Sequence, residues 1–252
     1  MTAPALSAVA LDGLPEVAAG AALAALLAAA LPADLAAGDV LCVAHKVVSK
    51  AEGRVRALDA IDPGERALAL AAEHDKDPRV VQAVLDESVA VVRAGHGVLI
   101  CETRHGLVCA NAGVDRSNTA ADGELILLPA DPDGSARALR AGIAAARGVA
   151  PAVVISDSFG RAWRMGQTDV AIGAAGIVAV DDWRGRRDSH GRELRATAIA
   201  VADAVAGAAD LVRAKDAAQP AVLVRGLDRF VTAEDGPGAA VLRRPPADDL
   251  FR

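Results

Sequence analysis

Residues 152–169 read Ala-Val-Val-Ile-Ser-Asp-Ser-Phe-Gly-Arg-Ala-Trp-Arg-Met-Gly-Gln-Thr-Asp, so an apolar run is followed at once by charged and polar side chains. The apolar run predicts a short buried strand, which would place Asp157 and Ser158 at its carboxyl end, where mixed sheets commonly bind ligands. Carboxylate and hydroxyl oxygens suit a hard divalent cation, and the guanidinium groups of Arg161 and Arg164 suit phosphate. The alternative is a solvated loop whose arginines pair with its aspartates and whose tryptophan covers the core.

Helices and strands are expected to alternate along the chain. Short apolar runs bounded by Gly, Pro or Asp predict strands at residues 40–44, 89–92, 98–102, 124–128, 152–155, 177–180 and 221–224. Helices are expected at residues 17–31, 78–87, 135–147 and 193–212. In the first of them, the leucine spacing stacks four side chains on one face, namely Leu23, Leu26, Leu27 and Leu31. Breaks at Gly236-Pro237-Gly238 and Pro245-Pro246 predict that residues 233–252 form a tail or surface strap after a folded region at 1–232.

Composition limits the class of protein. A chain of 252 residues with 53% hydrophobic content can bury a full core, as one large domain or two closely packed lobes. Aromatic residues make up only 2% and the net charge is -6, which argues against nucleic-acid binding. The apolar segment 17–31 is too short to span a membrane and ends at Pro32. Three cysteines without a CxxC pattern favour core positions in a reducing compartment, and therefore a cytoplasmic protein.

The common nucleotide and zinc motifs are absent, since the sequence has no GxxxxGK[ST], GxGxxG or HExxH. Two other segments carry candidate ligand groups. Residues 44–53 leave a predicted strand and supply His45, Lys46 and Lys50 before a glycine turn, where lysines could meet phosphate or simply be solvated. Residues 102–118 run through small side chains to Asp115, which could form a metal pair with Asp157 or belong to an ordinary capped turn.

Together these segments resemble one family, the coenzyme F420:L-glutamate ligases, also called F420-0 gamma-glutamyl ligases. The likeness covers about residues 8 to 230. It rests on two unusual patterns in order, AxAGxDxSN at 110–118 and DxxGRxWRxGQxD at 157–169, supported by Leu14-Pro15-Glu16, the segment 46–53, Asp188, Gly191-Arg192-Glu193-Leu194 and Val224-Arg225-Gly226. The resemblance implies a mixed α+β fold of two lobes and an intimate homodimer. Some relatives have a further flavin-reductase-like domain, and we expect this chain to be a stand-alone ligase.

The resemblance also implies the reaction. A GTP-dependent enzyme would join L-glutamate to the deazaflavin F420-0 and extend a gamma-linked tail, with Mg²⁺ or Mn²⁺ and with stimulation by K⁺. Positions that contact GTP in the family correspond here to Leu14, Pro15, Glu16, Val17, His45, Lys50 and Asn118. The family's metal ligands correspond to Asp115, Asp157 and Ser158. The sequence departs from the family at His45, usually serine, at Ser158, usually threonine, at Val17, where other apolar residues occur, and at residues 213–219, where alanines replace the expected glycines of a nucleotide loop.

The chemistry that this implies is activation of a carboxylate as an acyl phosphate, followed by attack of the glutamate amine. Lys50 and Arg161 are the candidates that would stabilise the transferring phosphoryl group. Three further arginines could contact substrate phosphate or carboxylates, or form surface ion pairs: Arg164, Arg184 and Arg187. A metal-dependent phosphohydrolase and a nucleotide-binding regulator remain alternatives. The number of glutamates added, the side chain of the deazaflavin and the preference for GTP over ATP do not follow from the sequence.

Overall fold

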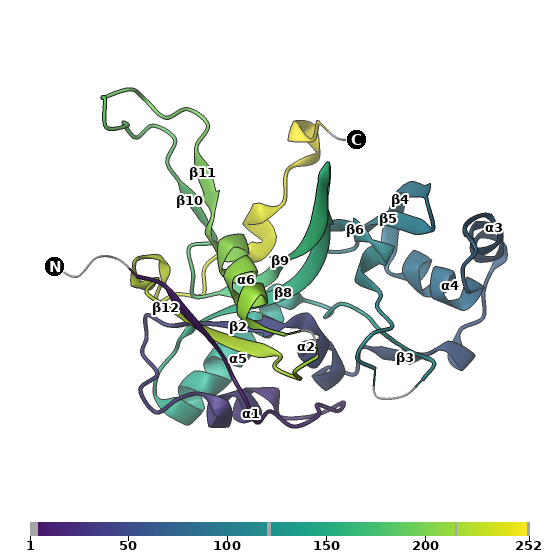
Figure 1. Cartoon of the computed structure of the whole chain (residues 1–252), viewed down its shortest axis with the longest axis horizontal. Coiled ribbons are helices and arrows are strands. Elements are labelled where there is room, and N and C mark those ends of the chain that lie inside the picture. Colours follow the sequence, from purple (N-terminus) through teal and green to yellow (C-terminus); the bar gives the residue numbers. More distant parts are fainter. Residues whose placement is uncertain (1–4, 120–121, 215, 251–252) are drawn as a thin grey trace.

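The computed structural model describes residues 5–119, 122–214 and 216–250, and it shows a mixed α+β protein with several sheets. Its centre is a five-stranded sheet in the order β1-β12-β2-β8-β9 (Figure 1). The neighbours β2 and β8 are parallel, whereas the other pairs are antiparallel. The bounds of these strands are Ser7–Ala10 for β1, Val40–Ala44 for β2, Ala152–Arg161 for β8, Arg164–Ala175 for β9 and Ala221–Arg225 for β12.

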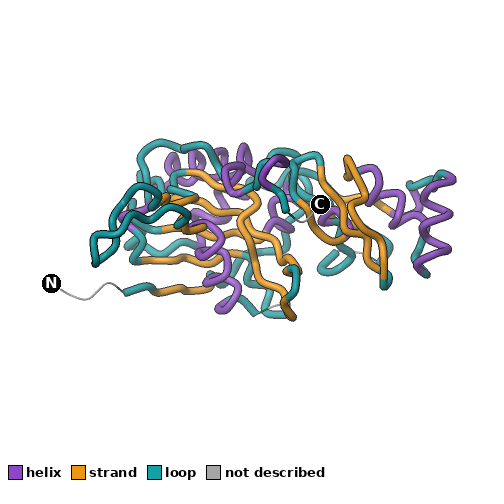
Figure 2. Tube along the Cα trace, turned by 90° about the horizontal axis from the view of Figure 1, so that it is seen from above, coloured by secondary structure: helices purple, strands orange, loops and turns teal. Residues whose placement is uncertain are grey.

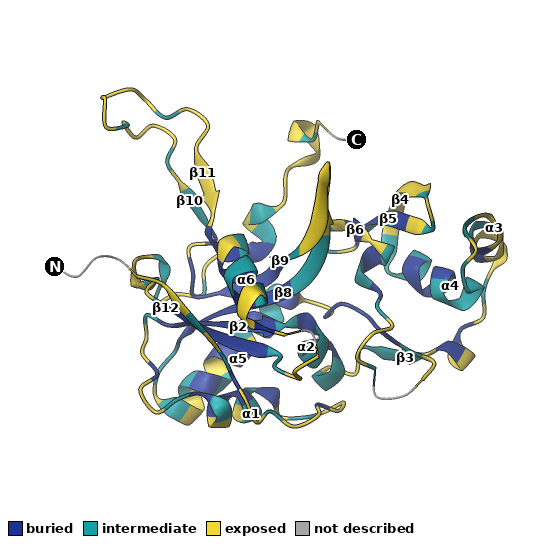
Figure 3. Ribbon diagram, in the orientation of Figure 1, coloured by how far each residue is buried: buried dark blue, intermediate teal, exposed yellow. Residues whose placement is uncertain are grey.

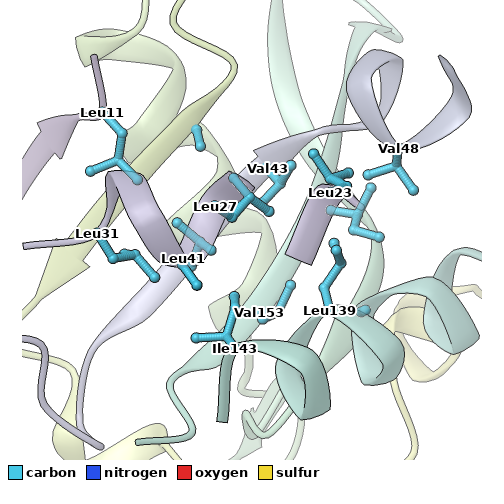
Figure 4. Close-up of a cluster of buried hydrophobic side chains, with 14 of the residues drawn as sticks. Leu11, Leu23, Leu27, Leu31, Leu41, Val43, Val48, Leu139, Ile143 and Val153 are labelled. Atoms are coloured by element: carbon cyan, nitrogen blue, oxygen red, sulfur yellow. The ribbon is translucent and has the colours of Figure 1, made fainter. Parts of the chain in front are cut away.

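Helices cover both faces of this sheet because its inner strands are apolar on both sides. On one face, Leu41 and Val153 pack with α1 (Leu23–Ala30) and α5 (Pro132–Arg147) in a core cluster (Figure 4). On the other face, Cys42 and Val154 pack against α6 (Val201–Val212). Alternate residues of one strand therefore enter different cores, as the two-residue period of a strand requires.

A smaller set of elements has its own core beyond the end of the central sheet. An antiparallel sheet of three strands packs with two helices: β4 (Ser88–Gly95), β5 (Val98–Thr103), β6 (Val108–Ala110), α3 (Glu65–His74) and α4 (Pro78–Asp86). Seen from above, α3 and α4 lie at one end of the molecule (Figure 2). Helix α2 (His45–Ala51) lies between this set and the central sheet, and β3 (Val55–Ala57), which pairs with β7 (Glu124–Ile126), lies below the set in Figure 1.

Several local predictions are confirmed. The strands expected at 40–44, 89–92, 98–102 and 221–224 coincide with β2, β4, β5 and β12, or lie inside them. Asp77 caps α4, because its side chain accepts a hydrogen bond from the Arg79 amide at 2.9 Å, and Pro78 follows at the first helical position. Helix α5 ends at Gly148, whose φ of 69° is the left-handed conformation that favours glycine.

Other predicted boundaries are wrong. The helix expected at 17–31 begins only at Leu23, because residues 17–22 form turns against α2, where the Gly20 amide donates to the Ala51 carbonyl. The helix expected at 193–212 begins at Val201, because its first part pairs with β10 (Val180–Asp182) as β11 (Ala198–Ala200). The strand expected at 177–180 is reduced to a bridge between Ile177 and Val231, followed by the start of β10. The strand expected at 124–128 ends at Ile126.

The largest correction concerns residues 157–169, which were expected to form a loop. They continue β8, turn at Ala162 and Trp163, and return as β9. The tip of this hairpin projects into solvent, so that Trp163 is 82% exposed and does not cover the core (Figure 3). These residues lack the apolar pattern that predicts a buried strand. Their strand conformation depends instead on the backbone hydrogen bonds between β8 and β9.

Part of the segment after residue 232 is anchored to α5. Arg140 of α5 donates to the carbonyls of Thr232 and Ala233 and pairs with Asp235 at 2.7 Å. Asp133 accepts a hydrogen bond from the Ala239 amide at 2.7 Å, in the short helix at 239–242. These contacts fasten residues 233–240 over the end of α5.

No helix in the described residues is long and apolar enough to cross a membrane. The cysteines are free and buried, as their apolar surroundings predicted. Burial raises the pKa of the Cys42 thiol to about 11 and that of the Cys109 thiol to about 12, and it also raises the pKa of Cys101.

Leu27→Ala should destabilise the protein by about 2–5 kcal/mol, because this side chain is fully buried between α5 and the sheet and its loss leaves a cavity. The measurement is urea unfolding followed by far-UV circular dichroism. Leu68→Ala removes a side chain that is 50% exposed and serves as the matched control. Equal losses for the two variants would contradict the packing described here.

The native thiols should be nearly inert at pH 8, since a pKa of about 11 leaves roughly one thiolate in a thousand and burial blocks access. We expect Ellman's reagent to label the native protein very slowly and to label all three cysteines after unfolding in guanidinium. Rapid labelling of the native protein would show that at least one cysteine is accessible.

Candidate active site

The candidate residues gather where β2 ends and α2 begins. Ala44, the last residue of β2, pairs with Ser156 in the parallel strand β8, so Asp157 lies just beyond the end of β2. The chain then turns directly into α2, whose first residues are His45 and Lys46. The site therefore lies at the carboxyl end of one parallel strand, although its partner strand continues past it.

The first contact at this site joins α2 to β8. His45 is 2% exposed, and its Nε2 atom lies 3.2 Å from the Asp157 carboxylate. The other ring nitrogen, Nδ1, lies 3.3 Å from the Ser49 hydroxyl, one turn further along the helix. His45 thus fills a buried space between the helix and the strand, which a serine at this position would leave open.

The second contact joins the next residue of α2 to the 110–118 loop. Lys46 Nζ lies 2.7 Å from Asp115 Oδ2, and the Ser117 amide donates to the same carboxylate at 2.8 Å. Burial raises the pKa of Asp115, but the hydrogen bonds from Lys46 and Ser117 outweigh this effect, so the pKa lies below its usual value. Asp115 is therefore ionised at neutral pH, as a metal ligand must be.

The three residues at 111–113, just before Val114 and Asp115, have an uncommon backbone conformation. Asn111, Ala112 and Gly113 have positive φ values of 51°, 53° and 72° in succession. Alanine rarely adopts this left-handed conformation, and a Cβ at Gly113 would lie 2.6 Å from the Leu128 side chain. Asp115 is then fixed by paired backbone hydrogen bonds with Ile126 of β7, at 3.0 and 2.8 Å. This explains physically why the loop consists of small residues.

The N-terminal segment meets the last turn of α2. Lys50 Nζ lies 2.5 Å from the Glu16 carboxylate. Val17 is buried and Leu14 packs against the same core cluster, which anchors residues 14–17 beside the helix. Asn118 is exposed, with a left-handed φ of 59°, just after the loop residues that contact Lys46. Thus His45 and Lys50 belong to α2, and Asp115 and Asp157 contact it.

A buried polar network lies behind Asp157, and sequence reasoning missed it. Asp169 of β9 is 1% exposed and accepts hydrogen bonds from the hydroxyls of Ser156 and Ser158 at 2.8 and 2.6 Å. The guanidinium of Arg213, at the end of α6, forms an ion pair with Asp169 and donates to Ser156 at 3.2 Å. Ser158 and Asp169 are cross-strand partners in the β8–β9 hairpin. Because these residues were expected to form a loop, this pairing was not predicted.

The network sets the role of the Ser158 hydroxyl. Its single proton is donated to Asp169, so its oxygen acts toward any other partner as an electron-pair donor. Arg213 begins the segment 213–219 that departs from the family pattern, and Lys215 in that segment lies outside the described residues. Ala218 adopts a φ of 52°, the conformation for which a glycine was expected.

The structure does not bring the candidate arginines to the two aspartates. Arg161 lies at the hairpin tip, four residues beyond Asp157 on an extended strand, which is about 13 Å along the chain. Its guanidinium donates to the Met165 carbonyl at 2.9 Å, and Arg164 is exposed at the same tip. Arg184 and Arg187 lie in the segment between β10 and β11, where they contact Asp182 and the Gly191 carbonyl.

The donor set suits a hard cation only in part. Asp115, Asp157 and Ser158 offer oxygen ligands, which is the chemistry that Mg²⁺ and Mn²⁺ prefer. Among the described residues, however, no group of three His, Cys, Asp or Glu side chains is placed to hold a metal ion. Two carboxylates and a hydroxyl fit a cation that takes its remaining ligands from phosphate oxygens and water, as Mg²⁺ commonly does.

Comparison with known proteins decides the family. The family model described as F420-0:Gamma-glutamyl ligase matches residues 13–226. The chain belongs to this family. It is 48% identical to the coenzyme F420:L-glutamate ligase of Methanopyrus kandleri, over 87% of this chain and 88% of that protein. It is 44% identical to the protein of that name from Methanothermobacter thermautotrophicus, over 98% and 99% of the two chains, and 44% identical to that from Haloarcula marismortui, over 96% and 94%. This F420-0:gamma-glutamyl ligase family member is therefore an enzyme of the ligase class.

Removing either partner of the buried pair should cost about 3–5 kcal/mol, because the remaining charge loses its closest opposite charge in the interior. We expect this loss for Asp169→Asn and for Arg213→Met, and a smaller loss for the double variant than the sum of the two. Urea unfolding gives all three values. Arg184→Met breaks an exposed ion pair and should leave the unfolding midpoint nearly unchanged. Additive losses would show that Asp169 and Arg213 are not coupled.

Proposed function

We propose that this protein is a GTP-dependent ligase that adds L-glutamate to coenzyme F420-0 and extends a gamma-linked polyglutamate tail in coenzyme F420 biosynthesis. The family membership supports the substrates. The observation that carries the assignment of the site is the pair of contacts on α2, in which His45 lies 3.2 Å from the Asp157 carboxylate and the adjacent Lys46 forms an ion pair with Asp115. Two carboxylates from distant segments are thereby gathered beside a lysine.

The metal ligands in this proposal are Asp115, Asp157 and Ser158. A bound Mg²⁺ or Mn²⁺ would supply charge neutralisation and alignment of the phosphoryl group during transfer. The chain's own contribution is to keep Asp115 ionised through Lys46, to position Asp157 beside His45, and to occupy the Ser158 hydroxyl proton with Asp169 so that the oxygen can act as a ligand. K⁺ is proposed as a stimulating ion without an assigned site.

The nucleotide is proposed to lie along α2. His45 and Lys50 belong to this helix, residues 14–17 and Asn118 lie beside it, and Lys46 and Lys50 would supply ammonium groups for the phosphates. Both lysines are paired with carboxylates in the structure, so an incoming phosphate would exchange partners with Glu16 and Asp115. Arg161, Arg164, Arg184 and Arg187 are proposed to contact anionic groups of the larger substrate that lie further from the metal.

The reaction is proposed to pass through an acyl phosphate. The carboxylate of F420-0 attacks the gamma-phosphorus of GTP, a bond forms between them, and GDP leaves with the electron pair of the broken bond. The neutral amine of glutamate then bonds to the acyl carbon, phosphate leaves with the electron pair of the broken carbon–oxygen bond, and the amine proton passes to a base or to water. Lys50 and Lys46 would stabilise negative charge on the phosphoryl oxygens in the first step.

The assembly is proposed to follow the family resemblance. We propose a ligase region at residues 1–232 with two lobes, built on the central sheet and on the elements around β4–β6, followed by a C-terminal segment at 233–252. Residues 1–4 and 251–252 lie outside the described parts of the chain. We further propose an intimate homodimer and a cytoplasmic location.

The test is mass spectrometry of the purified protein incubated with F420-0, GTP, Mn²⁺ and L-glutamate, with each component omitted in turn. We expect products heavier by whole glutamyl units only in the complete mixture. Consumption of GTP without glutamate would identify a phosphohydrolase, and binding of GTP without product would identify a regulator.

Asp157→Asn should lower ligase turnover by at least about a hundredfold, because one carboxylate of the proposed metal site is lost. Binding of Mn²⁺, followed by electron paramagnetic resonance, should weaken in the same variant, while its circular dichroism spectrum stays native. Asp62→Asn is a matched control, because Asp62 is exposed in the segment before α3 and lies outside the proposed site. Turnover near that of the unaltered protein would refute the assignment of Asp157.

A further inference from the structure

A surface pocket of about 380 Å³ opens beside Asp115. It lies between the start of α4 and the loop that carries Asp115. Its walls combine acidic, basic, amide and apolar side chains: Asp75, Lys76, Asp77, Val80, Asn111, Val114, Asp115 and Arg116. The function proposed above uses only Asp115 from this set.

The charges in this pocket are only partly compensated. The Asp77 carboxylate caps α4 and forms an ion pair with Arg79 at 2.7 Å. Asp115 forms an ion pair with Lys46. By contrast, no ion pair joins Lys76, Arg116 or Asp75 to another described residue, although the charge of Arg116 contributes to the lowered pKa of Asp77. The pocket therefore offers one ammonium group, one guanidinium group and one carboxylate that form no ion pair within the described parts of the chain.

Asn111 adds a hydrogen-bonding group in the wall. Its side-chain oxygen is buried and has no hydrogen-bond partner within the described residues. A buried acceptor without a donor costs free energy, and such groups are uncommon in native structures. Asn111 is also the first of the three left-handed residues, so backbone strain and an unsatisfied acceptor coincide at the edge of the pocket.

We propose that this pocket binds the incoming L-glutamate, an inference that rests on the ligase function proposed above. Free glutamate carries two carboxylates and one ammonium group at neutral pH, which matches two unpaired cations and one unpaired carboxylate. Lys76 and Arg116 hold the two carboxylates. Asp75 and the Asn111 amide oxygen receive the ammonium group. A nucleotide phosphate, by comparison, would meet three aspartates in the same space.

The position also suits the chemistry. Asp115 belongs to both the pocket and the proposed metal site, so an amino acid held here has its amine close to the carboxylate that is being activated. Amide formation needs the neutral amine, so the ammonium group must first release a proton, which can pass to water because the pocket is open at the surface. The pocket would thus supply the nucleophile beside Asp115, which Lys46 of α2 contacts.

The experiment compares steady-state kinetics of Lys76→Met and Arg116→Met with those of the unaltered enzyme, varying glutamate, GTP and F420-0 separately. We expect the KM for glutamate to rise about 10-fold to 100-fold in each variant, because one charge-assisted hydrogen bond is lost. The KM values for GTP and F420-0 should stay within about twofold. Arg93→Met is the matched control, since Arg93 is exposed on β4 in the same part of the molecule and lies outside the pocket.

A second readout separates binding of glutamate from a general loss of activity. Glutamine has an amide in place of the side-chain carboxylate of glutamate. One of Lys76 and Arg116 is proposed to hold that carboxylate, and the variant that lacks this residue should prefer glutamate over glutamine less strongly than the unaltered enzyme does. Saturation-transfer NMR with glutamate alone should give a weaker signal for the double variant than for the unaltered protein. Neither readout depends on a high turnover.

Unchanged KM values for glutamate in both variants would overturn the proposal. A rise in the KM for GTP or F420-0 alone would also overturn it and would assign the pocket to that substrate. Failure of the proposed function itself gives a different result, because the unaltered enzyme would then form no glutamyl product with any substrate mixture.

Discussion

The parallel pairing of β2 with β8 is the constraint on which the site depends. It is the one parallel pair of the central sheet, and it brings the end of β2 level with Ser156. Because the chain enters α2 without a connecting loop, the first residues of that helix are carried directly to the side of Asp157. The register of two strands thus sets the spacing of groups that are more than a hundred residues apart in sequence, and the cores on both faces hold that register.

The site is stabilised in two layers with different physical character. Toward solvent, the contacts of Lys46 and Lys50 with carboxylates can be exchanged for contacts with a ligand. Behind them, the ion pair of Asp169 with Arg213 is closed to water and directs the serine hydroxyls of β8. A rigid inner layer allows the outer layer to change partners without disturbing the strand that carries Asp157.

Local pattern was sufficient for the elements that bury apolar side chains. Strands β2 and β12 and the ends of α4 and α5 could be predicted because each has an apolar run, a cap or a stopping glycine. The continuation of β8 past Ser156 could not, since its stabilisation comes from pairing with β9 and its side chains resemble those of a loop. The same limit applies to the site: Asp115 and Asp157 follow from motifs, whereas Asp169, Arg213 and the pocket at Lys76 depend on contacts between distant segments.

The placement of the two tryptophans has a practical consequence for spectroscopy. Trp163 is exposed at the tip of the β8–β9 hairpin. Trp183 lies in the segment 183–197 between β10 and β11, here called the arm, with the Arg186 guanidinium 5.0 Å from its ring centre. The chain has no tyrosine, so its near-ultraviolet emission comes almost entirely from these two protrusions. Intrinsic fluorescence would therefore report events at the hairpin tip and the arm, such as contact with a substrate or a second subunit, while remaining nearly silent about the melting of the aliphatic cores.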